Sequence, residues 1–187
     1  MIFTPLSLAG AFRIDIEKLQ DDRGFFARSF CAEEFRGHDL ETHWQQMNIS
    51  FNERKGTLRG LHFQRPPAAE IKVVRCVHGA IWDVIVDLRA GSEDYGRWCG
   101  IELTSENRSM VYVPEGFAHG FQTLRPKTEV QYLVSVAYSP EHEGGLDFSD
   151  PGLSIAWPLP VTNISDKDRM QPLLKQIEPL LVSIYYR

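Results

Sequence analysis

The chain has 187 residues, of which 43 % are hydrophobic and 24 % charged. This composition is typical of a globular protein and excludes a disordered or fibrous one. The length predicts a single domain over residues 1–187. Acidic residues outnumber basic ones by 25 to 20, for a net charge of −5, whereas a nucleic-acid-binding protein normally carries a basic excess. No apolar run approaches the roughly 18 residues of a membrane span, and the N-terminus lacks the pattern of a signal peptide, so we expect contact with neither nucleic acid nor membrane.

The first predicted element is a short helix over residues 31–36. From residue 71 onward, apolar residues recur with a period of two, which predicts β-strands. Each strand is bounded by Gly, Pro, Asn or Lys, and the strands are expected at residues 71–77, 80–88, 97–104, 108–113, 118–124 and 128–138. Short, evenly spaced strands with turns between them predict an all-β protein with a closed or sandwiched antiparallel architecture.

The C-terminal region carries a second helical signal. Ser165 is a predicted N-cap, and Asp166 and Asp168 in the next turn suit the positive end of a helix dipole. A stripe with helical spacing follows, although Pro172 and Pro179 limit its length. The stripe consists of Leu173, Leu174, Ile177, Leu180 and Leu181. We therefore expect a short helix near each end of the chain.

The cysteines bear on where the protein acts. Cys31, Cys76 and Cys99 are odd in number and widely spaced. This arrangement fits free thiols in a reducing cytoplasm better than a disulfide framework or a zinc site. We therefore expect a cytoplasmic protein.

Two stretches with a histidine are similar to the signature stretches of the cupin superfamily. The first is Gly-Leu-His-Phe-Gln at residues 60–64, followed by Glu70, and the second is Pro-Glu-Gly-Phe-Ala-His at residues 114–119. Metal-binding cupins place His-x-His and a carboxylate in the first stretch and another histidine in the second. Here Gln64 replaces the second histidine of the pair, and an amide is a poor ligand for zinc or iron. We therefore expect the cupin jelly roll without a metal site.

Four ionisable residues alternate with apolar residues inside predicted strands. They are a lysine, a tyrosine and two histidines: Lys72, Tyr132, His62 and His119. Each one alone is compatible with core packing or a surface position. If their strand faces line the lumen of a barrel, the four together can remove a proton beside a carbonyl, stabilise an enolate and return a proton from the other side.

Basic residues close to this set could hold an anion. An arginine fork suits phosphate oxygens, and Arg59 lies just before the first histidine stretch, with Arg23 and Lys167 further away. Strict alternation puts Arg59 and His62 on opposite faces of a strand. Gly60 between them can mark a bulge that turns both side chains inward.

These stretches resemble the dTDP-4-dehydrorhamnose 3,5-epimerase family over roughly residues 2–175. Arg-Gly-Leu-His at 59–62 together with Pro-Glu-Gly-Phe-Ala-His-Gly-Phe at 114–121 is a highly specific combination, and residues 22–26, 72–75 and 165–168 also match. The resemblance implies a cupin-type jelly roll that needs neither metal nor cofactor. It implies an enzyme that inverts C3, C5 or both in a nucleotide-linked 4-keto-6-deoxyhexose, with dTDP-4-dehydro-6-deoxyglucose as the expected substrate.

The resemblance also implies roles for individual residues. His62 would be the base, oriented by Asp168, while Tyr132 would return the proton and Lys72 would stabilise the enolate oxygen. The positions implied to bind the sugar diphosphate or the nucleotide are Arg23, Phe26, Gln46, Asn48, Arg59, His119, Tyr138, Glu143 and Lys167. Family members are homodimers that exchange N-terminal strands, so Arg23 is expected to serve the pocket of a partner.

Three residues depart from the family pattern. Arg28 stands where the family usually has a glutamate on the nucleotide side, and Met47 and Ile49 replace more polar residues. The charge reversal at Arg28 leaves the nucleotide open among dTDP, UDP and CDP.

Other functions stay open at this point. They are a single-centre epimerase or ketosugar isomerase, and a non-catalytic sugar-binding jelly roll; Gln64 disfavours a metal-dependent oxygenase. The presence of His62, Asp168, Tyr132 and Lys72 together favours an enzyme, because binding alone requires neither an acid nor a base.

Overall fold

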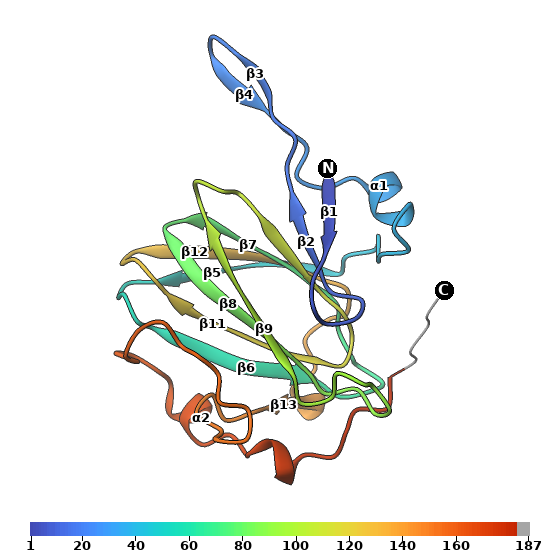
Figure 1. The fold of residues 1–187 in the computed structure, drawn as a ribbon, viewed down its shortest axis with the longest axis vertical. Helices are drawn as coiled ribbons and strands as arrows, with labels where there is room; N and C mark the ends of the chain where they lie inside the picture. The colour runs from blue at the N-terminus through green and yellow to red at the C-terminus, as the bar shows by residue number, and fades with distance from the viewer. Residues whose placement is uncertain (183–187) are drawn as a thin grey trace.

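The computed structural model describes residues 1–182, and two antiparallel sheets lie face to face in it (Figure 1). One sheet has six strands in the order β1-β2-β10-β7-β12-β5, and the other has five in the order β13-β6-β11-β8-β9. A third, two-stranded unit, β3-β4, forms a hairpin that stands away from the sandwich (Figure 1). The predicted all-β sandwich is confirmed.

The bounds of β7 to β12 lie within about two residues of those predicted from the period-two pattern, apart from the end of β12; for the other strands no bounds were predicted. The six-stranded sheet contains β1 (Ile2–Pro5), β2 (Phe12–Asp15), β5 (Gln46–Asn52), β7 (Lys72–His78), β10 (Met110–Val113) and β12 (Thr128–Val134). The five-stranded sheet contains β6 (Leu58–Gln64), β8 (Ala80–Asp87), β9 (Trp98–Thr104), β11 (Phe117–Thr123) and β13 (Glu143–Gly145). The hairpin consists of β3 (Leu19–Asp21) and β4 (Gly24–Phe26).

The main core lies between the two sheets. Val74 and Cys76 of β7 meet Phe117 and Phe121 of β11 in one buried cluster. Burying an aliphatic or aromatic side chain of this size stabilises the fold by about 1.5–3 kcal/mol. Lys72 shares the inward parity of Val74 at the beginning of β7, so the strand that builds this core also delivers a lysine to its edge.

Two further clusters cover the outer faces of the sheets. The C-terminal segment packs Leu153, Ile177 and Leu180 on the five-stranded sheet. The helix α1 (Ala32–Arg36) packs Phe35 on the six-stranded sheet near β2 and β10. At the edge strand β5 the outer face stays uncovered by the described residues, and Met47, Ile49 and Phe51 are more than half exposed there.

The helical predictions were partly right. Cys31 occupies the N-cap position of α1. Ser165 caps α2 (Asp166–Arg169), because its side chain accepts a hydrogen bond from the backbone N–H of Asp168 at 3.1 Å. Within the described part of the chain, no helix is long and apolar enough to cross a membrane.

The leucine-rich stripe at residues 173–181 was wrongly predicted as helix. It contains only a 3₁₀ turn, η2 (Leu174–Gln176). The backbone N–H of Leu180 donates to the carbonyl of Leu88, and Ala90 donates back to Leu180. The stripe therefore buries Ile177 and Leu180 without forming a helix, and Leu181 stays exposed.

The last predicted strand also ends earlier than residue 138. β12 stops at Val134, and the chain then turns toward η1 (Pro140–His142). Tyr138 therefore lies outside the sheet, and its backbone N–H donates to the Gln46 side chain at 2.9 Å.

Candidate active site

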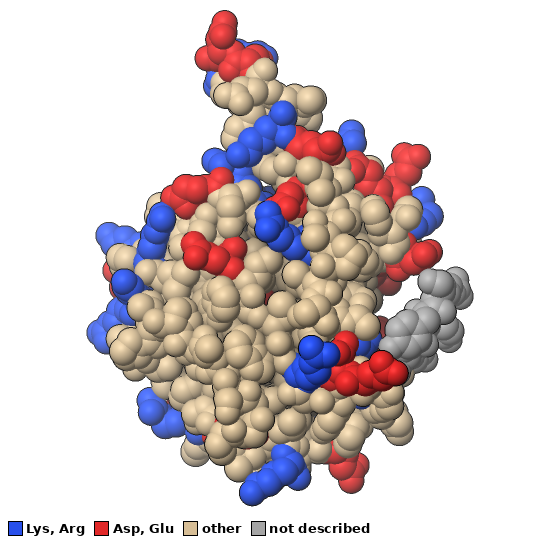
Figure 2. Space-filling view, in the orientation of Figure 1, with Lys and Arg blue, Asp and Glu red and all other residues tan. Residues whose placement is uncertain are grey.

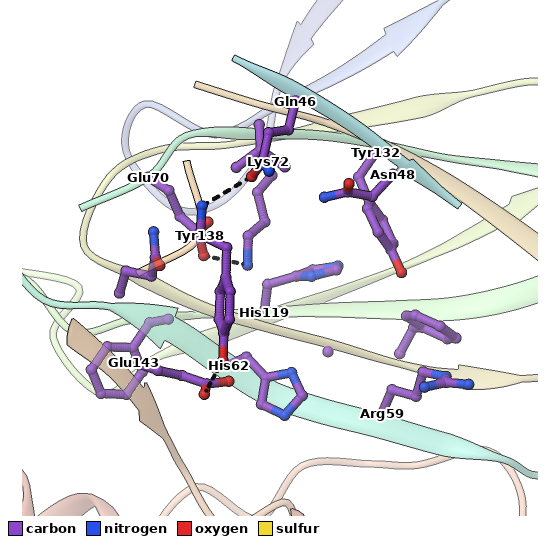
Figure 3. A pocket seen from close by; sticks show the side chains of 15 residues that line it. Gln46, Asn48, Arg59, His62, Glu70, Lys72, His119, Tyr132, Tyr138 and Glu143 are labelled. Carbon is purple, nitrogen blue, oxygen red and sulfur yellow. Dashed lines mark hydrogen bonds and ion pairs between the residues drawn. The ribbon is translucent and has the colours of Figure 1, made fainter. Parts of the chain in front are cut away.

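A cavity of about 270 Å³ lies between the two sheets (Figure 3). The six-stranded sheet lines it with Gln46, Asn48, Lys72, Tyr132 and Val134. The five-stranded sheet lines it with Arg59, His62, Phe63, Gln64, His119, Gly120, Phe121 and Glu143, and connecting segments add Glu70 and Tyr138. Nine of the thirteen residues predicted to act on or bind substrate thus line one cavity. Asp168 does not line it but contacts His62, which does.

The strand β6 presents both Arg59 and His62 to the cavity because its pairing with β11 is irregular. His62 pairs with His119, whereas Arg59 pairs with Phe121, so a step of three residues on β6 faces a step of two on β11. Gly60 within this step has φ +117°, and a Cβ there would lie 2.6 Å from the Cα of Gly120. Only glycine fits such a position. The predicted bulge is confirmed.

His62 and Asp168 form a hydrogen-bonded pair. Nε2 of His62 lies 2.7 Å from Oδ1 of Asp168, and Oδ2 of Asp168 accepts the backbone N–H of Gly60 at 3.1 Å. Burial pushes the pKa of Asp168 upward, but the hydrogen bonds from His62 and Gly60 and the charge of His62 outweigh burial and leave this pKa below its usual value. An ionised carboxylate only accepts hydrogen bonds, so Nε2 carries the hydrogen and Nδ1 of His62 is left to act as a base.

Tyr132 and Lys72 come from the opposite sheet. Burial raises the pKa of Tyr132, and the charge of Asp83 raises it further, against the hydrogen bond with Ser50 and the charge of Arg59. The phenol is therefore protonated at neutral pH. Lys72 is largely buried, and its Nζ lies 2.8 Å from the Glu70 carboxylate. A proton donor and an ammonium group thus face the two histidines across the cavity (Figure 3).

A polar group at the edge of the cavity joins Tyr138, Glu143 and Lys167. The Tyr138 hydroxyl donates to Glu143 at 2.8 Å, and Lys167 Nζ donates to the same oxygen at 2.6 Å. Burial favours a higher pKa for Glu143, but these two hydrogen bonds hold it below its usual value. The Tyr138 ring is 56 % exposed, so one face is free to stack on a planar group.

Two predicted binding positions, Arg23 and Phe26, and the residue that departs from the family pattern, Arg28, lie away from this cavity. Arg23 lies at the tip of the β3-β4 hairpin and bonds Asp21, while Phe26 on β4 is 70 % exposed. Arg28, at the base of the hairpin, donates to Glu34 at 3.0 Å. Figure 2 shows the hairpin as a projection from the body with charged side chains at its tip.

The sequence analysis assigned two carboxylates in this region no role towards substrate. Glu70 lines the cavity beside Lys72, and Asp83 lies behind His119, with Nε2 of His119 2.8 Å from Oδ2 of Asp83. The sequence did contain an indication for Asp83. An aspartate inside the apolar run of residues 80–88 requires a polar partner when the strand is buried.

The glutamine that interrupts the cupin histidine pair serves the backbone. Gln64 donates through Nε2 to the carbonyl of Ala68 at 3.0 Å and accepts the N–H of Ser139 at 2.6 Å. Within residues 1–182, no three His, Cys, Asp or Glu side chains are grouped so that they could hold a metal ion.

Comparison with known proteins identifies the family. The family model described as dTDP-4-dehydrorhamnose 3,5-epimerase matches residues 5–176. The chain belongs to this family. The dTDP-4-dehydrorhamnose 3,5-epimerase of Sinorhizobium fredii is 44 % identical over 178 residues, which cover 95 % of this chain and 91 % of that protein. The family resemblance, the isomerase class and the cupin-type fold predicted from the sequence are therefore confirmed.

Two solved structures are similar over most of their length. A dTDP-6-deoxy-D-glucose-3,5-epimerase of Legionella pneumophila, in complex with dTDP-4-keto-L-rhamnose, has a TM-score of 0.90 at 34 % identity, covering 96 % of this chain and 97 % of that one. A 3′-monoepimerase of Streptomyces bikiniensis, in complex with dTDP-quinovose, has a TM-score of 0.85 at 34 % identity, covering 91 % of this chain and 87 % of that one.

Proposed function

We propose that this enzyme inverts C3 and C5 of a dTDP-linked 4-keto-6-deoxyglucose, giving dTDP-4-dehydro-L-rhamnose, by acid–base chemistry of its own side chains. One observation carries the proposal. A histidine base paired with an aspartate and a protonated phenol come from opposite sheets and face the same cavity. Such an arrangement can take a proton from one side of a sugar ring and return one from the other.

The first step is removal of a proton from the carbon next to the ketone. Nδ1 of His62 takes this proton, and the ionised Asp168 stabilises the imidazolium that forms. Negative charge develops on the keto oxygen as the enolate forms. The ammonium group of Lys72, held by Glu70, faces the cavity as a partner for that charge.

The second step returns a proton to the opposite side of the ring. Tyr132 is the donor because it lies on the other sheet from His62 and carries its hydrogen at neutral pH. Inversion, rather than simple exchange, requires this second group. The cycle then ends with a proton on the carbon and the phenol re-protonated from His62 or solvent.

The remaining predicted residues bind the nucleotide diphosphate. The guanidinium of Arg59 lines the cavity and is oriented by a 2.7 Å hydrogen bond from its Nε to Asn52 and a 3.4 Å hydrogen bond from Nη2 to the Phe51 carbonyl, which leaves Nη1 available to phosphate. Gln46, Asn48 and His119 line the cavity and contact the sugar diphosphate, while Tyr138 stacks on the base next to Glu143 and Lys167.

We further propose that the enzyme is a cytoplasmic homodimer whose hairpins are exchanged. Leu19 and Phe26 on the hairpin are each 70 % exposed, and Met47 and Ile49 on the outer face of β5 are each 63 % exposed. Side chains of this size are usually covered when they cluster. A second copy would cover both surfaces and would bring Arg23 and Phe26 to its partner's cavity.

The second candidate is a single-centre epimerase. It is favoured by the similarity to the 3′-monoepimerase of Streptomyces bikiniensis, whose chain shares this fold. The same base and acid would then act at one carbon only, so the outcome depends on how the sugar ring fits beside Tyr132.

Incubation with dTDP-4-keto-6-deoxyglucose in deuterated water tests both candidates. The proposal predicts deuterium at C3 and C5 and a product of L-rhamno configuration, read by NMR. Deuterium and inversion at one carbon would establish the single-centre epimerase, and no incorporation would refute both. Parallel reactions with UDP- and CDP-linked substrates test the nucleotide, and we expect dTDP to be preferred because Glu34 neutralises Arg28 within the chain.

A further inference from the structure

The carboxylate of Asp83 is buried without a full set of partners. Asp83 lies in the middle of β8 and is 0 % exposed. Its Oδ2 lies 2.8 Å from Nε2 of His119, but its Oδ1 has no hydrogen-bond partner among residues 1–182. Buried polar atoms without a partner are rare in folded proteins. The stability of β8 therefore does not explain an aspartate at position 83.

A second aspartate on the same strand makes the contrast clear. Asp87 has the same inward parity on β8 and is equally buried. Both of its oxygens are bonded, to the Arg89 side chain and to the Ser92 hydroxyl. Asp87 is thus a satisfied structural ion pair, whereas the charge of Asp83 is directed at His119 alone.

The pair formed by Asp83 and His119 repeats the geometry of the catalytic pair. His62 and His119 face each other across the β6-β11 ladder. Each histidine meets a carboxylate through Nε2, at 2.7 Å for His62 and 2.8 Å for His119. Within the described chain, neither Nδ1 atom is hydrogen-bonded, and both histidines line the cavity. The site therefore contains two histidine–aspartate pairs side by side.

The two pairs differ in their exposure to solvent. The His62 side chain is 34 % exposed, which allows its Nδ1 to exchange protons with substrate and solvent. The His119 side chain is only 8 % exposed, and the carboxylate behind it is fully buried. A buried carboxylate is best compensated when the imidazole beside it is positively charged. Nδ1 of His119 would then carry a hydrogen and act as a donor.

We propose that Asp83 is a positioning residue that holds His119 as a hydrogen-bond donor, through Nδ1–H, to the sugar oxygen that gains negative charge during the reaction. This inference rests on the proposed function. Asp83 keeps Nε2 protonated, fixes the plane of the ring and stabilises its positive charge. His119 and Lys72 then share the stabilisation of the enolate, while His62 remains the base.

Three variants separate the position of the ring from its charge. Asp83→Asn keeps an oxygen that can accept Nε2–H but removes the charge, whereas Asp83→Ala removes both. Asp87→Asn is the matched control, because it alters an equally buried aspartate of the same strand that does not contact His119. The ring nitrogens of His119 are observed by ¹⁵N NMR of histidine-labelled protein without substrate, and the His119→Ala variant assigns the signals.

The spectra and the kinetics have defined expectations. In the wild type, we expect one hydrogen on Nε2 and another on Nδ1. Asp83→Asn retains the hydrogen on Nε2 but loses the one on Nδ1, and Asp83→Ala shows a mixture of tautomers. We expect kcat to fall about 10- to 100-fold in both Asp83 variants with KM changed less than threefold. Asp87→Asn leaves the His119 signals unchanged.

A double variant tests whether Asp83 acts through His119. Asp83→Asn combined with His119→Ala should be no slower than His119→Ala alone. Additive losses, or unchanged His119 signals in both Asp83 variants, would overturn the inference. The NMR measurement needs no turnover. If the wild type fails to convert the sugar but the His119 signals respond as expected, the proposed function fails and the Asp83–His119 linkage stands.

Discussion

The cavity and the hairpin, the two regions with predicted substrate-binding residues, are built in opposite ways. In the cavity the chain satisfies its own ionisable groups: Asp168 holds His62 and Glu70 holds Lys72. On the hairpin, Phe26 is 70 % exposed and the guanidinium of Arg23 bonds only its neighbour Asp21 among the described residues. The difference teaches that the paired ionisable groups of the cavity come from a single chain, whereas the hairpin leaves its exposed side chains for a second surface, which the proposed dimer would supply.

The edge strand β5 has a polar inner face and an apolar outer face, so it contributes both to the cavity and to the exposed surface. Gln46 and Asn48 face the cavity, whereas Met47 and Ile49 point outward and are exposed. In an ordinary half-buried strand the apolar face is the inner one. A polar inner face suits a ligand, and an apolar outer face suits a protein partner, so one strand serves both requirements.

The largest effect is expected within the cavity, from Asp168→Asn. Loss of the carboxylate charge leaves the imidazolium of His62 without support, so kcat should fall about 10²- to 10⁴-fold. Asp166→Asn, in the same short helix but without contact to His62, is the control and should keep full activity. Equal activity of the two variants would contradict the assigned pair.

The difference in stability between wild type and Asp168→Asn should depend on pH. The pKa of Asp168 is lowered in the folded protein. The ionised carboxylate therefore adds to the free energy of unfolding at pH values above the pKa of an aspartate in the unfolded chain, about 3.9. This stabilisation is lost as the pH falls through the pKa of Asp168 in the folded protein. Urea unfolding should therefore show wild type more stable than Asp168→Asn at pH 6, with the gap narrowing below about pH 4. If the difference in stability between wild type and Asp168→Asn grew below about pH 4, the lowered pKa of Asp168 would be contradicted.

A smaller effect is expected from Tyr132→Phe. The base remains, so exchange of the substrate hydrogen with solvent continues, but net inversion should slow about 10²-fold because the proton donor is missing. The ratio of exchange to inversion, measured by NMR in deuterated water, checks this. Because the pKa of Tyr132 is raised by burial, its tyrosinate absorption, obtained as wild type minus variant, should develop only above about pH 10.

The hairpin region is tested by the double variant Met47→Glu/Ile49→Glu. Two carboxylates in the apolar outer face of β5 should prevent dimer formation, and sedimentation should then give a monomer. We expect KM to rise about 10-fold because the partner's hairpin is lost. Leu181→Glu changes an 81 % exposed leucine elsewhere and is the control for an added charge. A Met47/Ile49 variant that stays dimeric would place the interface elsewhere.

The smallest effect is expected from Arg23→Ala at the hairpin tip. Loss of one phosphate contact should raise KM about threefold, less than loss of the whole hairpin, with kcat nearly unchanged. Mixed dimers sharpen the test: when Arg23→Ala and His62→Ala subunits are combined, an exchanged hairpin creates one cavity with both residues intact, so low-KM activity returns. If each hairpin served its own cavity, mixing would restore nothing.

Much of the site could be predicted because alternation in a strand fixes the direction of each side chain. Lys72, Tyr132 and His119 were placed correctly on inward faces by this rule alone. Arg59 and His62 violate strict alternation, and only Gly60 signalled the bulge that brings both inward. The pairing of His62 with Asp168 spans 106 residues and rests on tertiary packing, so the sequence provided it only through family resemblance.

The errors have physical causes as well. At residues 173–181 the spacing of leucines is helical, but backbone pairing with Leu88 and the prolines favoured an extended segment. Asp83 was overlooked because a single aspartate in an apolar strand does not reveal its partner. Its partner, His119, comes from the neighbouring strand β11, whose register with β8 is set by the fold.

The central claim is that His62 removes the proton from carbon, and solvent exchange in the His62→Ala variant tests it most directly. Wild type and variant are incubated with dTDP-4-keto-6-deoxyglucose in deuterated water, and deuterium at C3 and C5 is followed by NMR. We predict that incorporation catalysed by the variant falls to the rate without enzyme, while its folded structure is retained. Incorporation as fast as in the wild type would contradict the account.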